Sequence, residues 1–262
     1  MGIFRKIAKR IRGFKIKNGV LIKYKGKKRK VIIPVGVTSI GRWAFGFCRS
    51  KSIVIPEGVT NIGKEAFGRC FSLESINIPK SVTSIGEGVF EGCSKLESIA
   101  VEQGNPIYHS EGNCIIETKS KTLIAGCKNS VIPDDGSVTS IGDRAFSWCG
   151  SLTNIVIHDS VTSIGKEAFW RCFSLKSIVI PDSVTSIGEE AFWCCFSLES
   201  IVIPDRVTSI GDLAFSGCSS LKTIEYIGAE EQWEAVKQGR DWNPENAQVI
   251  YTGAYYGNSK SI

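Results

Sequence analysis

The chain has 262 residues, of which 42% are hydrophobic, and a formal net charge of +6 at neutral pH. No run approaches 18 consecutive apolar residues, which argues against a membrane-spanning helix, and no N-terminal apolar stretch is long enough for a secretory signal. The charge is uneven: residues 1–30 contain 13 Lys or Arg and no Asp or Glu, which leaves 19 basic and 26 acidic residues in the remainder. The positive charge is therefore a property of the N-terminus, and it does not favour nucleic acid as a partner of the rest of the chain.

Residues 1–13 are predicted to be a basic N-terminal tail. Its apolar residues, Ile3, Phe4, Ile7 and Ile11, share one face of a helical projection, and its basic residues lie elsewhere: Arg5, Lys6, Lys9, Arg10 and Arg12. Three interpretations stay open. The tail is a solvated, disordered segment, or it lies on an anionic membrane surface as an interfacial helix, or it contacts polyanions nonspecifically.

Residues 14–30 are predicted to form a hairpin cap. Asn18-Gly19 is a two-residue turn signal between the segments F-K-I-K and V-L-I-K-Y, and such a dipeptide between apolar strands favours a hairpin. We expect this hairpin to cover the open N-terminal edge of the core.

A repeated pattern, V-T-S-I-G-x-x-A-F-x-x-C, dominates the following chain and predicts its architecture. Its final Cys recurs at steps of 22, 23, 56, 23, 23 and 23 residues. A period in the twenties is typical of a solenoid, in which each unit contacts only its neighbours. We assign repeats to residues 31–101 and 131–223. The seven copies are Val37–Cys48, Val59–Cys70, Val82–Cys93, Val138–Cys149, Val161–Cys172, Val184–Cys195 and Val207–Cys218.

Each unit is predicted to contain one short strand and one short helical turn around a continuous thin core. In one copy the segment Ile76-Asn77-Ile78 alternates inward and outward as a strand does, and Ser81–Gly86 turns the corner, with Ile85 pointing inward. Gly86 is expected to adopt a backbone conformation closed to other residues, and residues 87–93 to form the helical turn. Stacking then predicts inward ladders of Phe and Cys.

The repeats are interrupted and ended by two further segments. Residues 102–130 replace about one repeat, and we predict an irregular hairpin insert with strands near Cys114–Glu117 and Thr122–Ala125. Residues 224–251 are predicted to be a C-terminal cap, with a helix at Glu230–Lys237 that has Trp233 and Val236 on one side and a strand at Val249–Tyr251. Residues 252–262 are predicted to be a disordered tail.

The full unit, L-x-x-I-x-I-P-x-x-V-T-S-I-G-x-x-A-F-x-x-C, resembles the BspA-type leucine-rich repeat family, and the resemblance covers residues 14–251. It implies a leucine-rich repeat horseshoe, a repeat solenoid with a concave parallel β-sheet and short helical or turn segments on the convex side. It also implies interaction with proteins. Family members are often surface adhesins with a secretion signal or a surface anchor, and we find neither motif here.

Catalytic chemistry has little support in the sequence. His109 and His158 lack a nucleophile or carboxylate at a useful spacing, and His158 stands where other repeats have Pro. The ladder cysteines are interpreted as buried free thiols, with disulfides or metal binding as alternatives; the chain has no C-x-x-C pair, the usual zinc spacing. We therefore expect no enzyme activity, no catalytic residue, no cofactor, no metal and no small-molecule substrate.

Two surfaces are candidates for contact with a partner. The outward strand positions form an uncharged, weakly apolar strip that includes Val54, Asn77, Val156, Val179 and Val202. Positions after the Ala-Phe pair form an aromatic edge that includes Trp148, Trp170, Arg171 and Trp193. Aromatic residues and Arg are enriched at binding hot spots. The alternative for the strip is plain β-propensity, and for the edge it is packing that shields the turns.

The sequence thus predicts a non-enzymatic leucine-rich repeat protein that binds or scaffolds a protein partner, whose identity it does not specify. One alternative is a peripheral membrane or polyanion-associated protein tethered by the basic N-terminus. Another is a surface adhesin exported by an unrecognised route. The cysteine content without a signal peptide predicts a cytoplasmic location, with peripheral attachment to a membrane as a variant of it.

Overall fold

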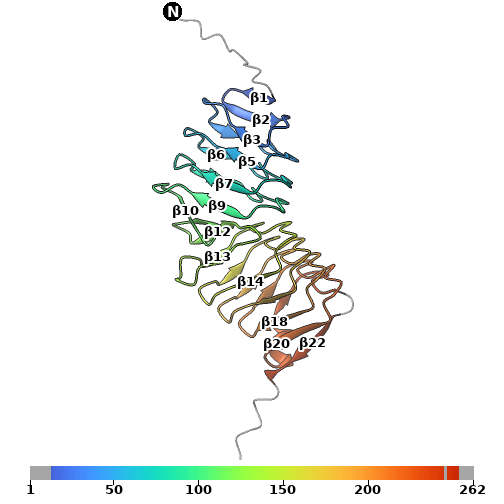
Figure 1. Ribbon diagram of the computed structural model, residues 1–262. Helices are drawn as coiled ribbons and strands as arrows, with labels where there is room; N and C mark the ends of the chain where they lie inside the picture. The colour runs from blue at the N-terminus through green and yellow to red at the C-terminus, as the bar shows by residue number, and fades with distance from the viewer. Residues whose placement is uncertain (1–12, 245–246, 254–262) are drawn as a thin grey trace, which may run out of the picture.

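The computed structural model describes residues 13–244 and 247–253. The rungs of the repeat solenoid stack along one axis, with the hairpin at one end and the C-terminal cap at the other (Figure 1). The predicted solenoid of parallel strands is confirmed. The predictions for residues 1–12, including Arg5, Lys6, Lys9, Arg10 and Arg12, and those for residues 254–262, lie outside the described residues.

The I-x-I segments form parallel strands, as predicted, in two separate sheets. The first Ile of each segment, such as Ile155, Ile178 or Ile201, is buried, and the residues before and after it face outward. The first sheet contains β3 (Lys30–Ile32), β5 (Ser52–Val54), β7 (Ser75–Ile78) and β9 (Ser98–Val101). The second contains β14 (Asn154–Val156), β16 (Ser177–Val179), β18 (Ser200–Pro204), β20 (Thr223–Ile227) and β22 (Gln248–Tyr251).

The corner predicted at Ser81–Gly86 contains a second strand in every repeat, which the sequence analysis missed. These strands have only two residues, too few to show a period of two. Ile85 is only partly buried, whereas Ile40 and Ile62 are fully buried, because β8 is the last strand of its sheet. The strands are β4 (Ser39–Ile40), β6 (Asn61–Ile62), β8 (Ser84–Ile85), β13 (Ser140–Ile141), β15 (Ser163–Ile164), β17 (Ser186–Ile187) and β19 (Ser209–Ile210).

The glycine that follows each of these strands is required for close packing between rungs. The predicted reason, a backbone conformation closed to other residues, is wrong. A Cβ on Gly211 would lie 2.3 Å from the backbone nitrogen of Glu189, and one on Gly86 would lie 2.3 Å from that of Lys64. Neither glycine has a left-handed φ. The backbone of one rung therefore presses on the rung before it, and only glycine leaves the room.

The segments after these glycines are series of turns, so the helical turn predicted for residues 87–93 is wrong. Each segment has two residues with left-handed backbone, such as Glu65 (φ 54°) and Arg69 (φ 56°), which interrupts a right-handed helix. Their N–H groups point along the solenoid instead. Phe67 donates to the Val89 carbonyl at 3.1 Å, and Arg69 donates to that of Glu91 at 2.6 Å. The turns thus form a third hydrogen-bonded ladder.

The Phe and Cys ladders are present inside the solenoid. Phe146, Phe169, Phe192 and Phe215 stack with neighbouring centroids 5.2 Å apart. All ten cysteines are free and buried. The Cys172 thiol donates to the Phe146 carbonyl at 3.2 Å, and the other ladder thiols, except Cys48 and Cys149, bond equivalent carbonyls. The thiol thus satisfies a buried carbonyl as well as filling space.

The insert divides the core in two, so the prediction of one continuous core is wrong. It contains β10 (Tyr108–Glu111), which was not predicted, and the predicted strands β11 (Cys114–Glu117) and β12 (Thr122–Ala125). Successive residues of β11 face opposite cores: Cys114 and Ile116 pack with residues that follow, and Ile115 with residues that precede. We call residues 14–101 the N-terminal block and residues 138–251 the C-terminal block. The junction is the insert between them together with the turns at residues 86–93 and 142–149 that face it.

Both ends of the solenoid are capped. At the N-terminus, β1 (Phe14–Lys17) pairs antiparallel with β2 (Val20–Tyr24) around the predicted Asn18-Gly19 turn, and β2 pairs with β4. At the C-terminus, helix α1 (Glu230–Glu234) is shorter than predicted, because the chain continues as strand β21 (Lys237–Gln238) beside β19. Trp233 and Val236, predicted to lie on one side, are both buried. Within the described ranges, no helix has the length and apolar character needed to cross a bilayer.

Candidate functional surfaces

The outward side chains of the first strand ladder form a surface that we call the valine strip: Val54, Asn77, Val156, Val179 and Val202. Val156 and Val179 are 63% and 64% exposed, and strand register places Val156, Val179 and Val202 side by side on β14, β16 and β18. The neighbouring outward residues are uncharged Asn154, Ser177 and Ser200. The C-terminal block therefore presents a row of apolar side chains beside a row of small polar ones.

The strip is less uniform in the N-terminal block. Val54 is 39% exposed, and the Asn77 amide donates to the Glu102 carboxylate at 2.9 Å. The junction separates this part from the part on β14 to β18. Exposed Ile32 extends the strip beside Val54, whereas exposed Ile250 is separated from Val202 by Glu225 on β20. Sequence reasoning missed both because it took only the strand that follows each copy of the motif, and Ile32 precedes the first copy while Ile250 lies in the C-terminal cap.

The aromatic edge, Trp148, Trp170, Arg171 and Trp193, is assembled on the turn ladder. Its three indoles are half-buried, and Trp170 stacks on Trp193 with centroids 5.4 Å apart. The Arg171 guanidinium lies 4.7–4.8 Å from the centroids of all three rings. Cation–π contact and stacking therefore already occupy much of the ring surface.

Phenylalanines in the equivalent turns are more exposed than the tryptophans of the aromatic edge. Phe47, Phe71 and Phe196 are 55%, 47% and 45% exposed. The indole nitrogens of Trp148 and Trp170 are buried without a hydrogen-bond acceptor. The indoles thus belong partly to the framework, which supports the packing interpretation for them.

A cluster of buried charges lies under the turn ladder, and sequence reasoning did not identify it. Arg144 contacts three carboxylates, Glu65 at 2.7 Å, Glu91 at 3.5 Å and Glu167 at 2.6 Å, whose side chains are 5–8% exposed. Arg42 also pairs with Glu65 at 3.0 Å. The available signal was the second residue after the repeat glycine, which is charged in four copies: Glu65, Arg144, Glu167 and Glu190.

The pKa values of two carboxylates in this cluster, Glu65 and Glu91, are shifted in opposite directions. Burial alone would raise the pKa of Glu65, but hydrogen bonds from Arg42 and Trp43 and the charges of Arg42 and Arg144 outweigh it and lower the pKa. For Glu91, burial and the Glu65 carboxylate raise the pKa against the charges of Arg144 and Arg69. The cluster thus holds more negative charge than its guanidinium groups neutralise.

The reactive side chains are placed for structure. His109 Nδ1 lies 2.9 Å from the Thr118 hydroxyl, on the insert hairpin. Burial raises the pKa of Cys114 and of Cys149 to about 12, so both remain protonated and weakly nucleophilic at neutral pH. In the part of the chain that the structure describes, no group of three or more His, Cys, Asp or Glu is placed to hold a metal ion.

The family model of the BspA type leucine rich repeat region matches residues 16–136 and 139–233, in six copies. The chain belongs to the BspA-type leucine-rich repeat family. Its repeats are therefore those of a family of interaction and surface proteins, and the resemblance inferred from the motif is confirmed. None of the curated proteins is similar enough to count as a match.

Solved leucine-rich repeat structures resemble this chain. A leucine rich cell surface protein of Faecalibacterium prausnitzii is 33% identical, with a TM-score of 0.60, over 79% of this chain and 62% of that one. This chain thus spans less than two thirds of that protein. A leucine-rich repeat protein of Eubacterium ventriosum is 24% identical, with a TM-score of 0.63, over 87% of this chain and 76% of that one, and shows the fold alone.

Proposed function

We propose that this BspA-type leucine-rich repeat protein is a non-enzymatic module that binds a protein partner on the valine strip. The observation that supports the proposal is the row of Val156, Val179 and Val202, in register on adjacent strands and lined by small polar residues. Two of these valines are more than 60% exposed. Covering them would remove apolar surface from water at little cost in burying charge.

The strip is favoured over the aromatic edge because the indoles of the edge are already in contact with one another and with Arg171. A partner that docked there would gain only the ring surface left exposed. Within the part of the chain that the structure describes, Val156 and Val179 remain 63% and 64% exposed, so this area is available to a partner.

Affinity capture on the immobilised chain, quantified by mass spectrometry, tests this proposal. Val179→Glu places a charge in the centre of the strip and should remove the specific partner. Thr185→Glu, which adds the same charge at an exposed position before β17, should retain it, as should Trp170→Ala. Loss with Trp170→Ala and retention with Val179→Glu would contradict the proposal and transfer the site to the aromatic edge.

A second candidate function is attachment to an anionic membrane surface through the hairpin cap. Its basic residues are exposed and, within the described residues, none is in an ion pair with a carboxylate: Lys15, Lys17, Lys25, Lys27, Lys28, Arg29 and Lys30. Each Lys or Arg close to an anionic membrane surface contributes about 1 kcal/mol to the free energy of binding. Co-sedimentation with phosphatidylserine vesicles, lost when Lys27, Lys28, Arg29 and Lys30 are changed to Gln, would support it; equal binding to neutral vesicles would contradict it.

Two observations bear on where the protein acts. The buried free thiols support a reducing compartment, which is our proposal, whereas the similarity to a cell surface protein supports display outside the cell. Alkylation before and after unfolding of protein from its native source distinguishes them. The cytoplasmic proposal predicts thiols that react only after unfolding, and a disulfide between Cys172 and Cys195 would contradict it.

A further inference from the structure

The hydrogen-bonded turn ladder is interrupted at the junction. In other rungs the ladder Phe donates its N–H to the next rung, as Phe67 does to Val89 and Phe146 does to Ala168. Among the described residues, no backbone hydrogen bond joins the turn of Phe90 to the insert rung that follows it. Both strand ladders also end here, at β8 and β9. The backbone therefore holds the two blocks together less firmly than it holds neighbouring repeats.

Two glycines open a passage across this gap. Gly88 and Gly92 have left-handed backbone and occupy the positions that carry large side chains in most other repeats. A Cβ on Gly88 would lie 3.5 Å from Arg144 Cδ, and one on Gly92 would lie 3.0 Å from Arg69 Cγ. The absent side chains thus leave a slot through which an arginine from each block crosses the third repeat.

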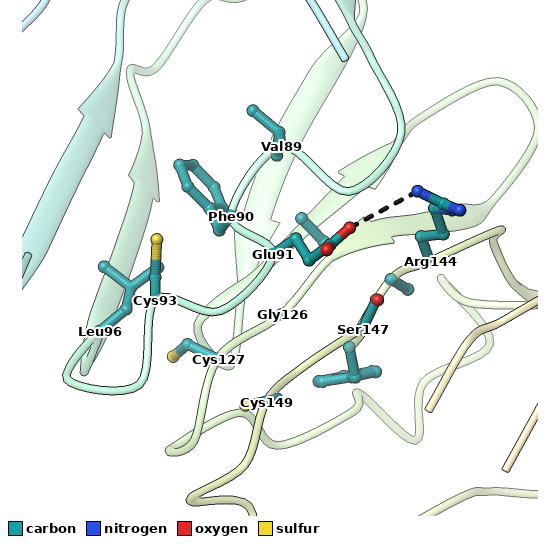
Figure 2. A pocket seen from close by; sticks show the side chains of 13 residues that line it. Val89, Phe90, Glu91, Cys93, Leu96, Gly126, Cys127, Arg144, Ser147 and Cys149 are labelled. Carbon is teal, nitrogen blue, oxygen red and sulfur yellow. Dashed lines mark hydrogen bonds and ion pairs between the residues drawn. The ribbon is translucent and has the colours of Figure 1, made fainter. Parts of the chain in front are cut away.

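Each arginine contacts the block across the slot, and Arg144 is also anchored in its own block by Glu167 at 2.6 Å. Arg144 extends from the C-terminal block to Glu91 and Glu65 in the N-terminal block, and Figure 2 shows it reaching Glu91 across the junction. Arg69 extends the other way, and its guanidinium lies 4.6 Å from the ring centroid of Trp148. Beside them is a cavity of about 10 Å³ between Phe90 and Phe146, no larger than a single water.

We propose that Arg144 and Arg69 form a two-way latch that fixes the orientation of the two blocks across a junction where the backbone ladders stop. Buried ion pairs often contribute more to the choice of one geometry than to stability. The latch would set how the two parts of the valine strip face a partner, but the proposal concerns the junction and stands without any partner.

Hydrogen exchange of the full chain, followed by mass spectrometry, tests the latch with Arg144→Gln. The variant leaves Glu91 and Glu167 without the charge of Arg144, and Glu65 with Arg42 alone. Amides of residues 86–93 and 142–149 should therefore exchange at least roughly tenfold faster, while those of residues 207–218 stay unchanged. Arg240→Gln is the matched control. It removes an ion pair with Asp212 at 2.8 Å whose arginine is 89% exposed, and exchange at the junction should not change.

Uniformly faster exchange along both blocks, or unchanged exchange at the junction, would overturn the proposal. If Arg144→Gln does not fold, Arg144→Lys carries the test, because it keeps the charge but cannot bridge three carboxylates at once. It should speed exchange at the junction alone, and exchange equal to the wild-type chain there would count against the latch. Gly88→Ala, which partly fills the slot, should give the same local pattern.

Discussion

At the scale of single residues, the carboxylates around Arg144 are the least balanced part of the molecule. Glu91 faces two carboxylates, Glu65 and Glu167, and two guanidinium groups, Arg144 and Arg69. Its pKa is raised by burial and by Glu65, so the folded chain binds a proton there more readily than the unfolded chain does. This contribution to stability grows as the pH falls from neutral towards the ordinary pKa of Glu.

Glu91→Gln should therefore raise the free energy of unfolding at neutral pH, and its advantage over the wild-type chain should shrink as the pH falls. Glu65 has the opposite sign: its pKa is lowered, so its contribution is present above the ordinary Glu pKa and is lost at lower pH. Urea titrations of the Glu91→Gln and wild-type chains between pH 7 and pH 4 measure the difference in their free energies of unfolding. A variant that is less stable than the wild-type chain throughout would refute the charge imbalance.

The inner and outer aromatic residues of one turn should differ in their contribution to stability. Phe169 is fully buried, so Phe169→Ala should cost about 3–5 kcal/mol. Trp170 is half-buried and stacks on Trp193 and Arg171, so Trp170→Ala should cost about 1–2 kcal/mol. A fully exposed ring would cost less than about 1 kcal/mol. Equal losses in chemical denaturation would show that the assignment of inner and outer positions is wrong.

At the scale of elements, the repeat is a three-sided coil whose corners depend on close backbone packing. Gly188→Ala would place a Cβ 2.5 Å from the Gly165 carbonyl carbon, and since backbone cannot yield as a side chain can, we expect a loss of about 3 kcal/mol. Gly150→Ala is the control, because its Cβ would meet only the Phe173 ring, at 3.3 Å. Thermal unfolding compares the two, and an equal shift for both would argue against the packing role.

How much of these elements is predictable depends on how each is encoded. The I-x-I strands, the hairpin at Asn18-Gly19 and the Phe ladder follow from alternation, turn chemistry and repetition, and all three are present. The turn ladder was predicted as helix because Phe90 and Cys93 are three residues apart, a spacing that a helix and two successive turns share. The left-handed residues that distinguish the two, such as Glu65, carry no sequence signal.

The candidate surfaces were predictable only where they repeat. The valines of the strip each follow a copy of the motif, whereas Ile32 precedes the first copy and Ile250 lies in the C-terminal cap. Arg144 contacts Glu65 and Glu91 across the insert of residues 102–130. The sequence does not predict the path of this insert, so it does not predict that these residues meet.

At the scale of the whole molecule, the chain is two stacked cores that a hairpin separates and two arginines connect. Among the described residues, Val156, Val179 and Val202 lie in register on β14, β16 and β18, and the first two are more than 60% exposed. Our account therefore places partner binding on that sheet of the C-terminal block, with the turn ladder serving as framework.

The most direct test of this account is a hydrogen-exchange footprint of the chain with and without the protein that it captures. The account predicts slower exchange for amides in β14, β16 and β18, with no change in the turns at residues 165–172 and 188–195. Protection confined to those turns, or to the hairpin at residues 14–30, would contradict it.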